Sequence, residues 1–463
     1  MELTSANSQV EASTPHRVVA MPFPGRGHIN PMMNLCMLLA SKQPHFLITF
    51  IVTEEWLAFL SSQTELPTNI SFSTIPNVIP SELVRAADHP GFVEATLTNM
   101  EEPVEQVIDG LDSRPVVIIY DVFLGWVPGV GNRRNIPVAS LWPMSATVFS
   151  IFKHTHLLVQ NGHFPVTDLS EQGEDVVDYI PGVRSTRILD LPSPYYGRGL
   201  PILHRVLEAV SLVQKAQFLL FTSVYELEQK VIDALRDEYS MPVYAIGPAI
   251  PYFKIKDNCS TNDENVPHYI KWLDSQPHDS VLYISQGSFL SVSSDQLDEI
   301  VAGVLHSGVS YLWVTKMEAS RINSGKGLVV PWCDQLRVLC HPSVGGFWSH
   351  CGWNSTKEGV FAGVPILTLP IMWDQIPNSK IIVEDWKSGW RVKERTANET
   401  ITKRDEIERL VKRFMESDSI EGKILRKRVG ECKEIVRQAT AEGGTSNNSI
   451  DAFIDNMFQT NGN

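Results

Sequence analysis

Two polar side chains directly follow apolar segments in the first third of the chain, where they could act on a ligand. His28 lies in the turn 24–28 (PGRGH) after the predicted strand 16–24, and Asp121 follows the predicted strand 115–120. Open α/β sheets bind ligands at the carboxyl ends of their strands, and a neutral imidazole can accept a proton near pH 7. The same positions suit a histidine that caps a turn and an aspartate that bonds backbone amides. The residues alone leave both interpretations open.

A second candidate site lies where the predicted strand 344–348 runs into a polar turn and then a helix from about Asn354. The free amides and the aligned dipole at the start of a helix attract anions. The turn carries His350, Gly352, Trp353, Asn354 and Ser355. Because asparagine and serine commonly begin helices, the local chemistry by itself favours an ordinary N-cap.

A glycine-serine turn, Gly287-Ser288, follows the predicted strand 281–285. Such a turn at the carboxyl end of a strand suits contact with phosphate, although any strand-to-helix connection needs a turn there. The cysteine and histidine pairs at 340–341 and 350–351 match no common zinc spacing, so no metal site is predicted.

Short apolar segments alternate with longer helical patterns along the whole chain. Apolar strands separated by helices indicate parallel sheets that are covered on both faces. The predicted strands are 16–24, 46–53, 70–75, 115–120, 137–141, 218–223 and 243–246, followed by 281–285, 311–315, 327–331, 344–348 and 365–370. The sequence therefore predicts an α/β fold with two Rossmann-like doubly wound domains that face each other across a cleft.

A polar stretch over 249–266 interrupts this alternation and is typical of an interdomain linker. The predicted domains are 1–248 and 267–445. An apolar stripe predicts a last helix, over about 446–463, that packs back on the first domain. The stripe consists of Ile450, Phe453, Ile454 and Met457.

The composition disfavours several classes of function. The chain has 463 residues, enough for two or three cores, and its formal net charge is 39 − 53 = −14. An acidic chain is a poor partner for nucleic acid or an anionic membrane. No segment reaches the ~18–20 apolar residues that span a bilayer, and no secretory signal is recognised. We therefore expect a cytoplasmic monomer with reduced cysteines.

The segment 332–375 closely resembles the signature box of the plant UDP-sugar-dependent glycosyltransferases, the family 1 enzymes of secondary metabolism. Many matches at fixed spacings make this pattern far more specific than a lone glycine motif. The matching residues are Trp332, Gln335, His350, Cys351, Gly352, Trp353, Asn354, Ser355, Glu358, Gly363, Val364, Pro365, Asp374 and Gln375. The resemblance implies the GT-B fold, with the sugar donor bound by the second domain.

The resemblance also implies roles for the residues of the donor site. Trp332, Cys333 and Gln335 would contact the uracil, and Glu358 the ribose hydroxyls. The diphosphate would be held by the turn of His350, Gly352, Trp353, Asn354 and Ser355, with Gly287 and Ser288 as a second element. Asp374 and Gln375 would hydrogen-bond the sugar. In this family glutamine at the last position is associated with glucose donors, so UDP-glucose is the expected co-substrate, with no other cofactor and no metal.

In the first domain, the family's G-H-x-x-P loop matches Gly27, His28 and Pro31. The resemblance implies that His28 is the general base and that Asp121 orients its ring and stabilises the imidazolium. The reaction would be a single displacement with inversion that gives a β-glucoside of a hydroxyl or carboxyl compound. A catalytically silent UDP-sugar-binding protein on the same fold is the alternative. A dinucleotide-dependent oxidoreductase is disfavoured, because the turn 24–28 lacks the G-x-G-x-x-G pattern.

Four positions depart from the family pattern: Gln286, Asp334, Ser349 and Pro143, the last of which replaces a threonine that reaches the sugar. The expected acceptor is a small lipophilic phenolic, flavonoid or terpenoid. Aromatic residues of the first domain suggest this, although they could equally form its core: Phe123, Trp126, Phe149, Phe152, Tyr195 and Tyr196.

Overall fold

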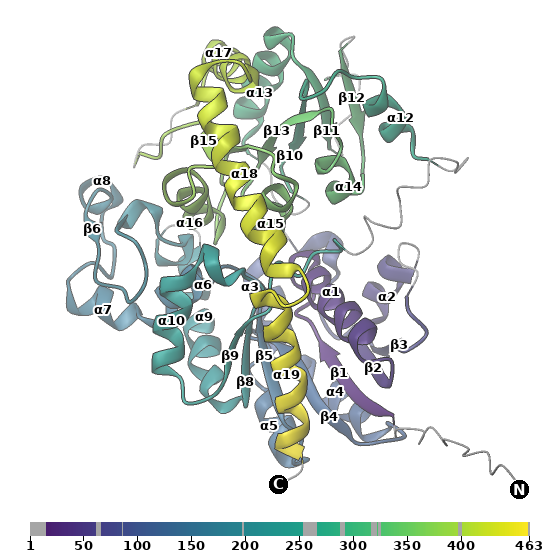
Figure 1. Cartoon of the computed structure of the whole chain (residues 1–463). Coiled ribbons are helices and arrows are strands. Elements are labelled where there is room, and N and C mark those ends of the chain that lie inside the picture. The colour runs from purple at the N-terminus through teal and green to yellow at the C-terminus, as the bar shows by residue number, and fades with distance from the viewer. Residues whose placement is uncertain are drawn as a thin grey trace, which may run out of the picture.

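The computed structural model describes residues 15–61, 66–85, 87–196, 199–252, 266–287, 292–315, 322, 326–396 and 401–461. Two parallel sheets dominate the described residues, each at the centre of one half of the molecule (Figure 1). Helices cover both faces of each sheet, which confirms the predicted fold class. A short antiparallel pair, β6 (Val176–Val177) and β7 (Thr186–Arg187), lies apart from them.

The first sheet has seven strands within the described residues, and most of their side chains are buried. In spatial order the strands are β3 (Ile70–Ile75), β2 (Phe46–Thr53), β1 (His16–Met21), β4 (Pro115–Asp121), β5 (Val138–Trp142), β8 (Phe218–Phe221) and β9 (Val243–Ala245). The β-branched and aromatic residues of these segments suit a pleated sheet that is buried on both faces.

The second sheet has six strands in the described part of the chain. In spatial order they are β12 (Gly327–Val330), β11 (Ser310–Val314), β10 (Val281–Ser285), β13 (Val344–Ser349), β14 (Ile366–Thr368) and β15 (Gly389–Arg391). The strands predicted at 311–315, 327–331 and 365–370 correspond to β11, β12 and β14 with shifted ends. The edge strand β15 was not predicted.

The helices around the first sheet are α1 (Arg26–Lys42), α2 (Glu54–Ser61), α3 (His89–Asn99), α4 (Glu101–Asp109), α5 (Val127–Arg133), α6 (Ala146–Lys153), α7 (Thr155–Gln160), α8 (Leu169–Gln172), α9 (Leu200–Leu212) and α10 (Gln229–Glu238). Short single-turn segments join them: η1 (Glu82–Val84), η2 (Ile188–Asp190), η3 (Ser193–Tyr195), η5 (Val213–Lys215) and η6 (Tyr225–Leu227).

The helices around the second sheet are α12 (His268–Asp274), α13 (Ser294–Ser307), α14 (Gln335–Leu339), α15 (Trp353–Ala362), α16 (Gln375–Lys380) with its continuation η8 (Ile381–Asp385), α17 (Arg404–Met415) and α18 (Ile420–Thr440). The last helix, α19 (Thr445–Asn461), returns to the first sheet (Figure 1). Its residues Ile450, Phe453, Ile454 and Met457 are buried in the same cluster as β1, β2 and β4.

Each sheet has one switch point, a pair of adjacent parallel strands from which the chain adds further strands on one side and then on the other. In the first sheet this point lies between β1 and β4, and in the second between β10 and β13. Crevices outside the carboxyl ends of such strands bind ligands in open α/β sheets. His28 and Asp121 follow or end the first pair, while Gly287 and His350 follow the second pair. Ser288 and most of the predicted linker, residues 253–265, lie outside the described residues.

Candidate active site

His28 lies in the first turn of α1, and its ring is bonded to Asp121 at the end of β4. Nδ1 of His28 is 2.7 Å from Oδ2 of Asp121, which is completely buried, whereas the histidine side chain is 22% exposed. The other carboxylate oxygen accepts a hydrogen bond from the Phe123 amide at 3.1 Å. Because an ionised carboxylate only accepts, Nδ1 carries the proton and Nε2 is left with a free lone pair. The pair has the geometry of a histidine base that is oriented by a carboxylate.

Two phenylalanine rings pack around this histidine. The ring centroids of Phe23 and Phe123 lie 5.2 and 5.8 Å from that of His28. Phe123 therefore belongs to the wall of the site. In contrast, Phe149, Phe152 and Tyr195 are buried in the core of the first half. For these three residues the core interpretation holds, so they provide no argument about an acceptor.

His350 lies in the turn after β13, and its ring packs between Gly352 of the same turn and Gly287, which follows β10. A Cβ atom added to Gly287 or Gly352 would lie 2.8 or 2.6 Å from Nε2 of His350, closer than such atoms approach. Gly287 has φ of 84°, which only glycine adopts at low cost. Burial lowers the pKa of His350 to about 4, so its imidazole is neutral at pH 7. His350 can therefore offer a hydrogen bond to a phosphate but no positive charge.

The helix α15 begins at Gly352, and no side chain caps it. The alternative of an N-cap by Asn354 or Ser355 is therefore wrong, because both residues lie inside the first turn. The first helical bond runs from the Thr356 amide to the Gly352 carbonyl, so the amides of Trp353, Asn354 and Ser355 precede the helical ladder. Their free N–H groups and the helix dipole suit a diphosphate.

Some side chains of this turn contact the other half of the molecule. Asn354 donates from Nδ2 to the carbonyl of Gly27 at 2.9 Å, one residue before His28. The indole of Trp353 donates to the carbonyl of Thr222 at 3.1 Å. The side chain of Trp353 thus joins the two halves, and only its amide faces the phosphate turn.

The predicted nucleoside-binding residues form one hydrogen-bonded group. Nε2 of Gln335 donates to Oε2 of Glu358 at 2.6 Å and to Oγ of Ser355 at 2.9 Å. Oε1 of Gln335 accepts from the hydroxyl of Tyr283 at 3.1 Å. Tyr283 could not be recognised from the sequence, because it lies inside an apolar strand. Burial raises the pKa of Glu358 to about 7.

Trp332, which directly precedes Cys333 in the chain, is 58% exposed, as a stacking surface for a base requires. The neighbouring Cys333 is buried, and its sulfur lies 3.5 Å from the Tyr283 hydroxyl. Asp334, one of the departures from the family pattern, caps α14 by accepting from the Arg337 amide at 3.1 Å. Its carboxylate therefore has a structural role.

Asp374 and Gln375 lie at the start of α16, opposite His28. Oε1 of Gln375 accepts from the amides of Ile371 and Met372 at 2.9 and 3.2 Å, which leaves its NH₂ group as a donor. Asp374 accepts from Asn378 at 2.9 Å. Burial raises the pKa of Asp374 to about 6, and its hydrogen bond from Asn378 opposes this rise.

Sequence reasoning missed two aromatic residues beside this turn, His89 and Trp373. Their ring centroids are 5.0 Å apart although one belongs to α3 and the other precedes α16. Burial and the charges of Arg85 and His28 lower the pKa of His89 to about 4. The Trp373 amide also donates to Oγ of Ser193 at 2.7 Å. A contact of this kind depends on the packing of the two halves and leaves no local pattern.

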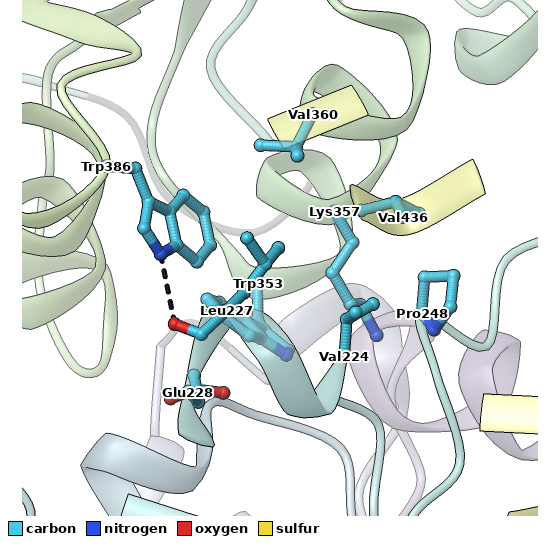
Figure 2. Close-up of a pocket in the computed structure, with 9 residues that line it drawn as sticks. All are labelled: Val224, Leu227, Glu228, Pro248, Trp353, Lys357, Val360, Trp386 and Val436. Carbon is cyan, nitrogen blue, oxygen red and sulfur yellow. Dashed lines mark hydrogen bonds between the residues drawn. The ribbon is translucent and has the colours of Figure 1, made fainter. Parts of the chain in front are cut away.

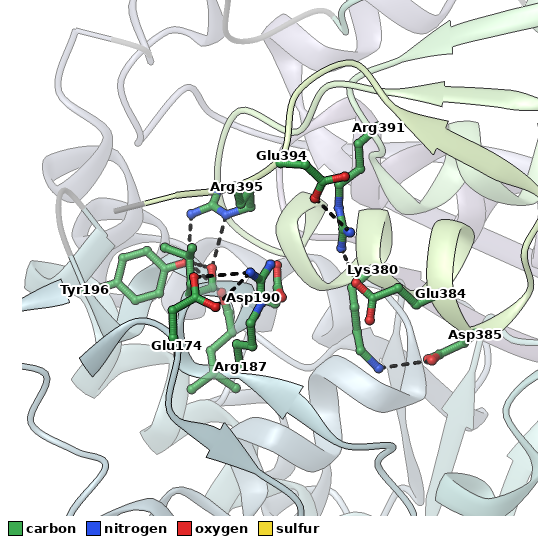
Figure 3. A network of polar contacts seen from close by, with 12 residues as sticks. Glu174, Arg187, Asp190, Tyr196, Lys380, Glu384, Asp385, Arg391, Glu394 and Arg395 are labelled. Atoms are coloured by element: carbon green, nitrogen blue, oxygen red, sulfur yellow. Dashed lines mark hydrogen bonds and ion pairs between the residues drawn. The ribbon is translucent and has the colours of Figure 1, made fainter. Parts of the chain in front are cut away.

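The two halves also meet in two regions away from the site. A cavity of about 10 Å³ between η6 and α15 is lined by apolar residues and by the side chains of Lys357 and Glu228 (Figure 2). On the other side, Arg395 donates to the Leu189 carbonyl at 3.1 Å and to the Tyr196 hydroxyl at 3.3 Å (Figure 3). The position of the half around the second sheet relative to His28 is thus fixed at several points.

No helix in the described ranges has the length and hydropathy of a membrane span. Nor do three or more histidine, cysteine, aspartate or glutamate residues gather at a point that could hold a metal ion, as far as the described part of the chain shows.

A histidine hydrogen-bonded to a buried carboxylate at one switch point, with an uncapped helix start at the other, is the arrangement expected of a nucleotide-sugar-dependent glycosyltransferase of two Rossmann-like domains. Comparison with known proteins agrees. The model of the family described as UDP-glucoronosyl and UDP-glucosyl transferase matches residues 211–426. UDP-glycosyltransferase 87A2 of Arabidopsis thaliana is 50% identical over 449 residues, which cover 96% of this chain and 97% of that protein. UDP-glycosyltransferase 87A1 of the same plant is 48% identical over 441 residues, or 94% and 99% of the two chains.

Solved structures of plant enzymes have the same fold. The Phytolacca americana enzyme UGT2, in complex with UDP-2-fluoro-glucose and pterostilbene, has a TM-score of 0.81 at 26% identity, over 96% of this chain and 99% of that one. Medicago truncatula UGT71G1, in complex with UDP-glucose, has a TM-score of 0.80 at 28% identity, over 96% and 98%. The chain belongs to the plant family 1 UDP-glycosyltransferases and has the GT-B fold.

Proposed function

We propose that the protein is an inverting glucosyltransferase that transfers glucose from UDP-glucose to a hydroxyl or carboxyl group of a small lipophilic plant metabolite. The observation that carries this proposal is the 2.7 Å contact between Nδ1 of His28 and the buried carboxylate of Asp121. A silent UDP-sugar-binding protein would have no use for a base that is oriented in this way.

In the proposed reaction, Nε2 of His28 takes the proton of the acceptor hydroxyl while that oxygen bonds to the anomeric carbon of the sugar. The bond between the anomeric carbon and the diphosphate oxygen breaks, and UDP leaves with the electron pair. Asp121 stabilises the imidazolium that forms. A single displacement from an α-linked donor inverts the anomeric carbon and gives a β-glucoside.

The free amides at the start of α15 would hold the charge of the leaving diphosphate. Because helix-end amides and the neutral His350 supply this stabilisation, we propose that transfer needs no metal. The free NH₂ group of Gln375 favours glucose, in line with the family association of glutamine at this position. Phe23 and Phe123 beside His28 favour a lipophilic acceptor. A cytoplasmic location and a monomeric state complete the proposal.

The test is a panel of phenols, flavonoids and terpenoid alcohols with UDP-glucose or UDP-galactose, in the presence of EDTA. We expect transfer from UDP-glucose without metal and a β-configured product in the NMR spectrum. The variant His28→Ala should lose about 10²–10⁴-fold in turnover while it still binds UDP. His156→Ala, which removes an exposed histidine of the same half, is the control. If the wild-type protein binds UDP but glycosylates no acceptor, the silent-binder alternative is correct.

A further inference from the structure

The backbone that leads into His28 passes through the Pro24–Gly25 peptide, which lies outside helix α1. Gly25 precedes α1, and no side-chain hydrogen bond caps this helix. The Gly25 carbonyl accepts from the amides of His28 and Ile29 at 2.9 and 2.8 Å. Gly25 thus links the Pro24–Gly25 peptide to the first turn of α1, so a shift of that peptide would be passed through Gly25 to the turn that carries His28.

Arg85, from the segment between β3 and α3, holds this peptide from the side. Its Nη1 donates to the Pro24 carbonyl at 3.1 Å and pairs with Oε2 of Glu82 at 3.0 Å. A Cβ atom added to Gly25 would lie only 2.5 Å from the same Nη1, so the guanidinium packs directly on the glycine. Only 11% of the Arg85 side chain is exposed, which limits its freedom to take another position.

A second route joins Arg85 to the histidine through aromatic rings. The guanidinium lies 5.5 Å from the ring centroid of Phe92, whose ring is 6.1 Å from that of Phe23. Phe23 in turn packs against His28 at 5.2 Å. Both the backbone and the ring packing of His28 thus depend on the place of one arginine.

We propose that Arg85 is a positioning residue, which fixes the Pro24–Gly25 peptide so that His28 keeps its hydrogen bond to Asp121. This inference rests on the proposed role of His28 as the base. The distance of 2.7 Å leaves little tolerance, because a displacement of about 1 Å in a reacting group can cost about 10²-fold in rate.

The first measurement is NMR of the free protein, which requires no known acceptor; turnover is the second measurement. The proton on Nδ1 of His28, held by Asp121, gives a strongly deshielded resonance, which is assigned by its loss in His28→Ala. We expect Arg85→Met to lose or broaden this resonance and to reduce turnover about tenfold or more, with unchanged affinity for UDP. The control is Arg133→Met, which removes an arginine that pairs with Glu101 and Glu105 on the surface.

A second variant changes Gly25, the other partner in the contact with the Arg85 guanidinium. Gly25→Ala would push the guanidinium off the peptide, so we expect the same loss of the resonance. In the double variant Arg85→Met/Gly25→Ala the methyl group meets no guanidinium, so the effect should be no larger than that of either single change.

Retention of the His28 resonance in both single variants would overturn the proposal, as would additive effects in the double variant. These results are independent of the proposed function. If His28→Ala kept full turnover, the assignment of the base would be wrong, whatever the resonance in the Arg85 variants showed.

Discussion

The two switch points of the molecule differ in the groups that form them: side chains at the first and mainly backbone groups at the second. Between β1 and β4, two side chains form the site, and the carboxylate of Asp121 is completely buried against the ring of His28. Between β10 and β13, glycines and free helix-end amides form the site, and Gly287 and Gly352 leave room for the ring of His350. The first point is suited to moving a proton, and the second to holding a charge.

This difference explains how an acidic chain can bind a diphosphate. The net charge is −14, and burial keeps His350 neutral. The attraction must therefore come from backbone dipoles, whose contribution does not depend on the net charge of the protein. Changes at the first point should affect turnover, whereas changes at the second should affect donor affinity.

The largest effect is expected for Asp121→Asn. An amide that donates to Nδ1 would favour the tautomer in which Nε2 carries the proton and cannot accept another. Turnover should fall about 10²–10⁴-fold, with UDP affinity within about twofold of the wild type, as measured by calorimetry. Asp109→Asn, at a surface carboxylate paired with Arg134, is the control. A large loss of UDP affinity in Asp121→Asn would break the distinction between the two points.

Gly352→Ala should act on the donor instead. The new Cβ atom would displace the ring of His350 from the phosphate turn, so UDP affinity should fall about tenfold or more. Gly430→Ala is a matched control, because a Cβ atom there meets no atom within 4 Å. Titration calorimetry with UDP measures both variants. Wild-type affinity in Gly352→Ala would show that this turn does not hold the diphosphate.

The pH dependence of donor binding should follow Glu358. Its pKa is raised to about 7, and the ionised carboxylate is the better acceptor for ribose hydroxyls. Affinity for UDP-glucose should therefore rise several-fold from pH 6 to pH 8 and then level off. The variant Glu358→Gln should bind more weakly at pH 8 and show little change over this range. If the affinity of Glu358→Gln for UDP-glucose rose with pH as steeply as that of the wild type, the titrating group would not be Glu358.

The smallest effect is expected at the contact between the halves. The amine of Lys357 is buried without a hydrogen-bond partner among the described residues, and burial lowers its pKa to about 7 (Figure 2). Below pH 7 the folded protein must bury a charge that water solvates in the unfolded chain. This cost disappears as the pH rises from about 7 to about 10, the ordinary pKa of lysine.

Lys357→Met should therefore raise the melting temperature by about 2–4 °C at pH 6 and by less at pH 9.5. Differential scanning calorimetry at both pH values measures this change, with the exposed Lys427→Met as the control. A larger gain at the higher pH would contradict the assignment.

Most of the fold could be predicted because its strands are continuous apolar segments. The exceptions have physical causes. The edge strand β15 has three residues, Gly389–Arg391, too few for a hydrophobic pattern. The helices α17 and α18 are separate, because Ser419 caps the second helix by accepting from the Gly422 amide at 3.0 Å.

The site could be predicted only in part. The spaced motifs place His28, Gln335 and Glu358 in the chain, but they do not say which side chains meet. The indole of Trp353 lies between the halves, and the rings of His89 and Trp373 come together across them. Such contacts depend on how two distant segments pack together, and local hydrophobic periodicity does not indicate this packing.

The return of α19 to the first sheet has a consequence for biosynthesis. Ile450, Phe453, Ile454 and Met457 complete the core around β1, β2 and β4. A ribosome synthesises these residues only after the whole second half, so the core of the first half stays incomplete until then. The two halves thus mature together, although the donor half can close its own core first.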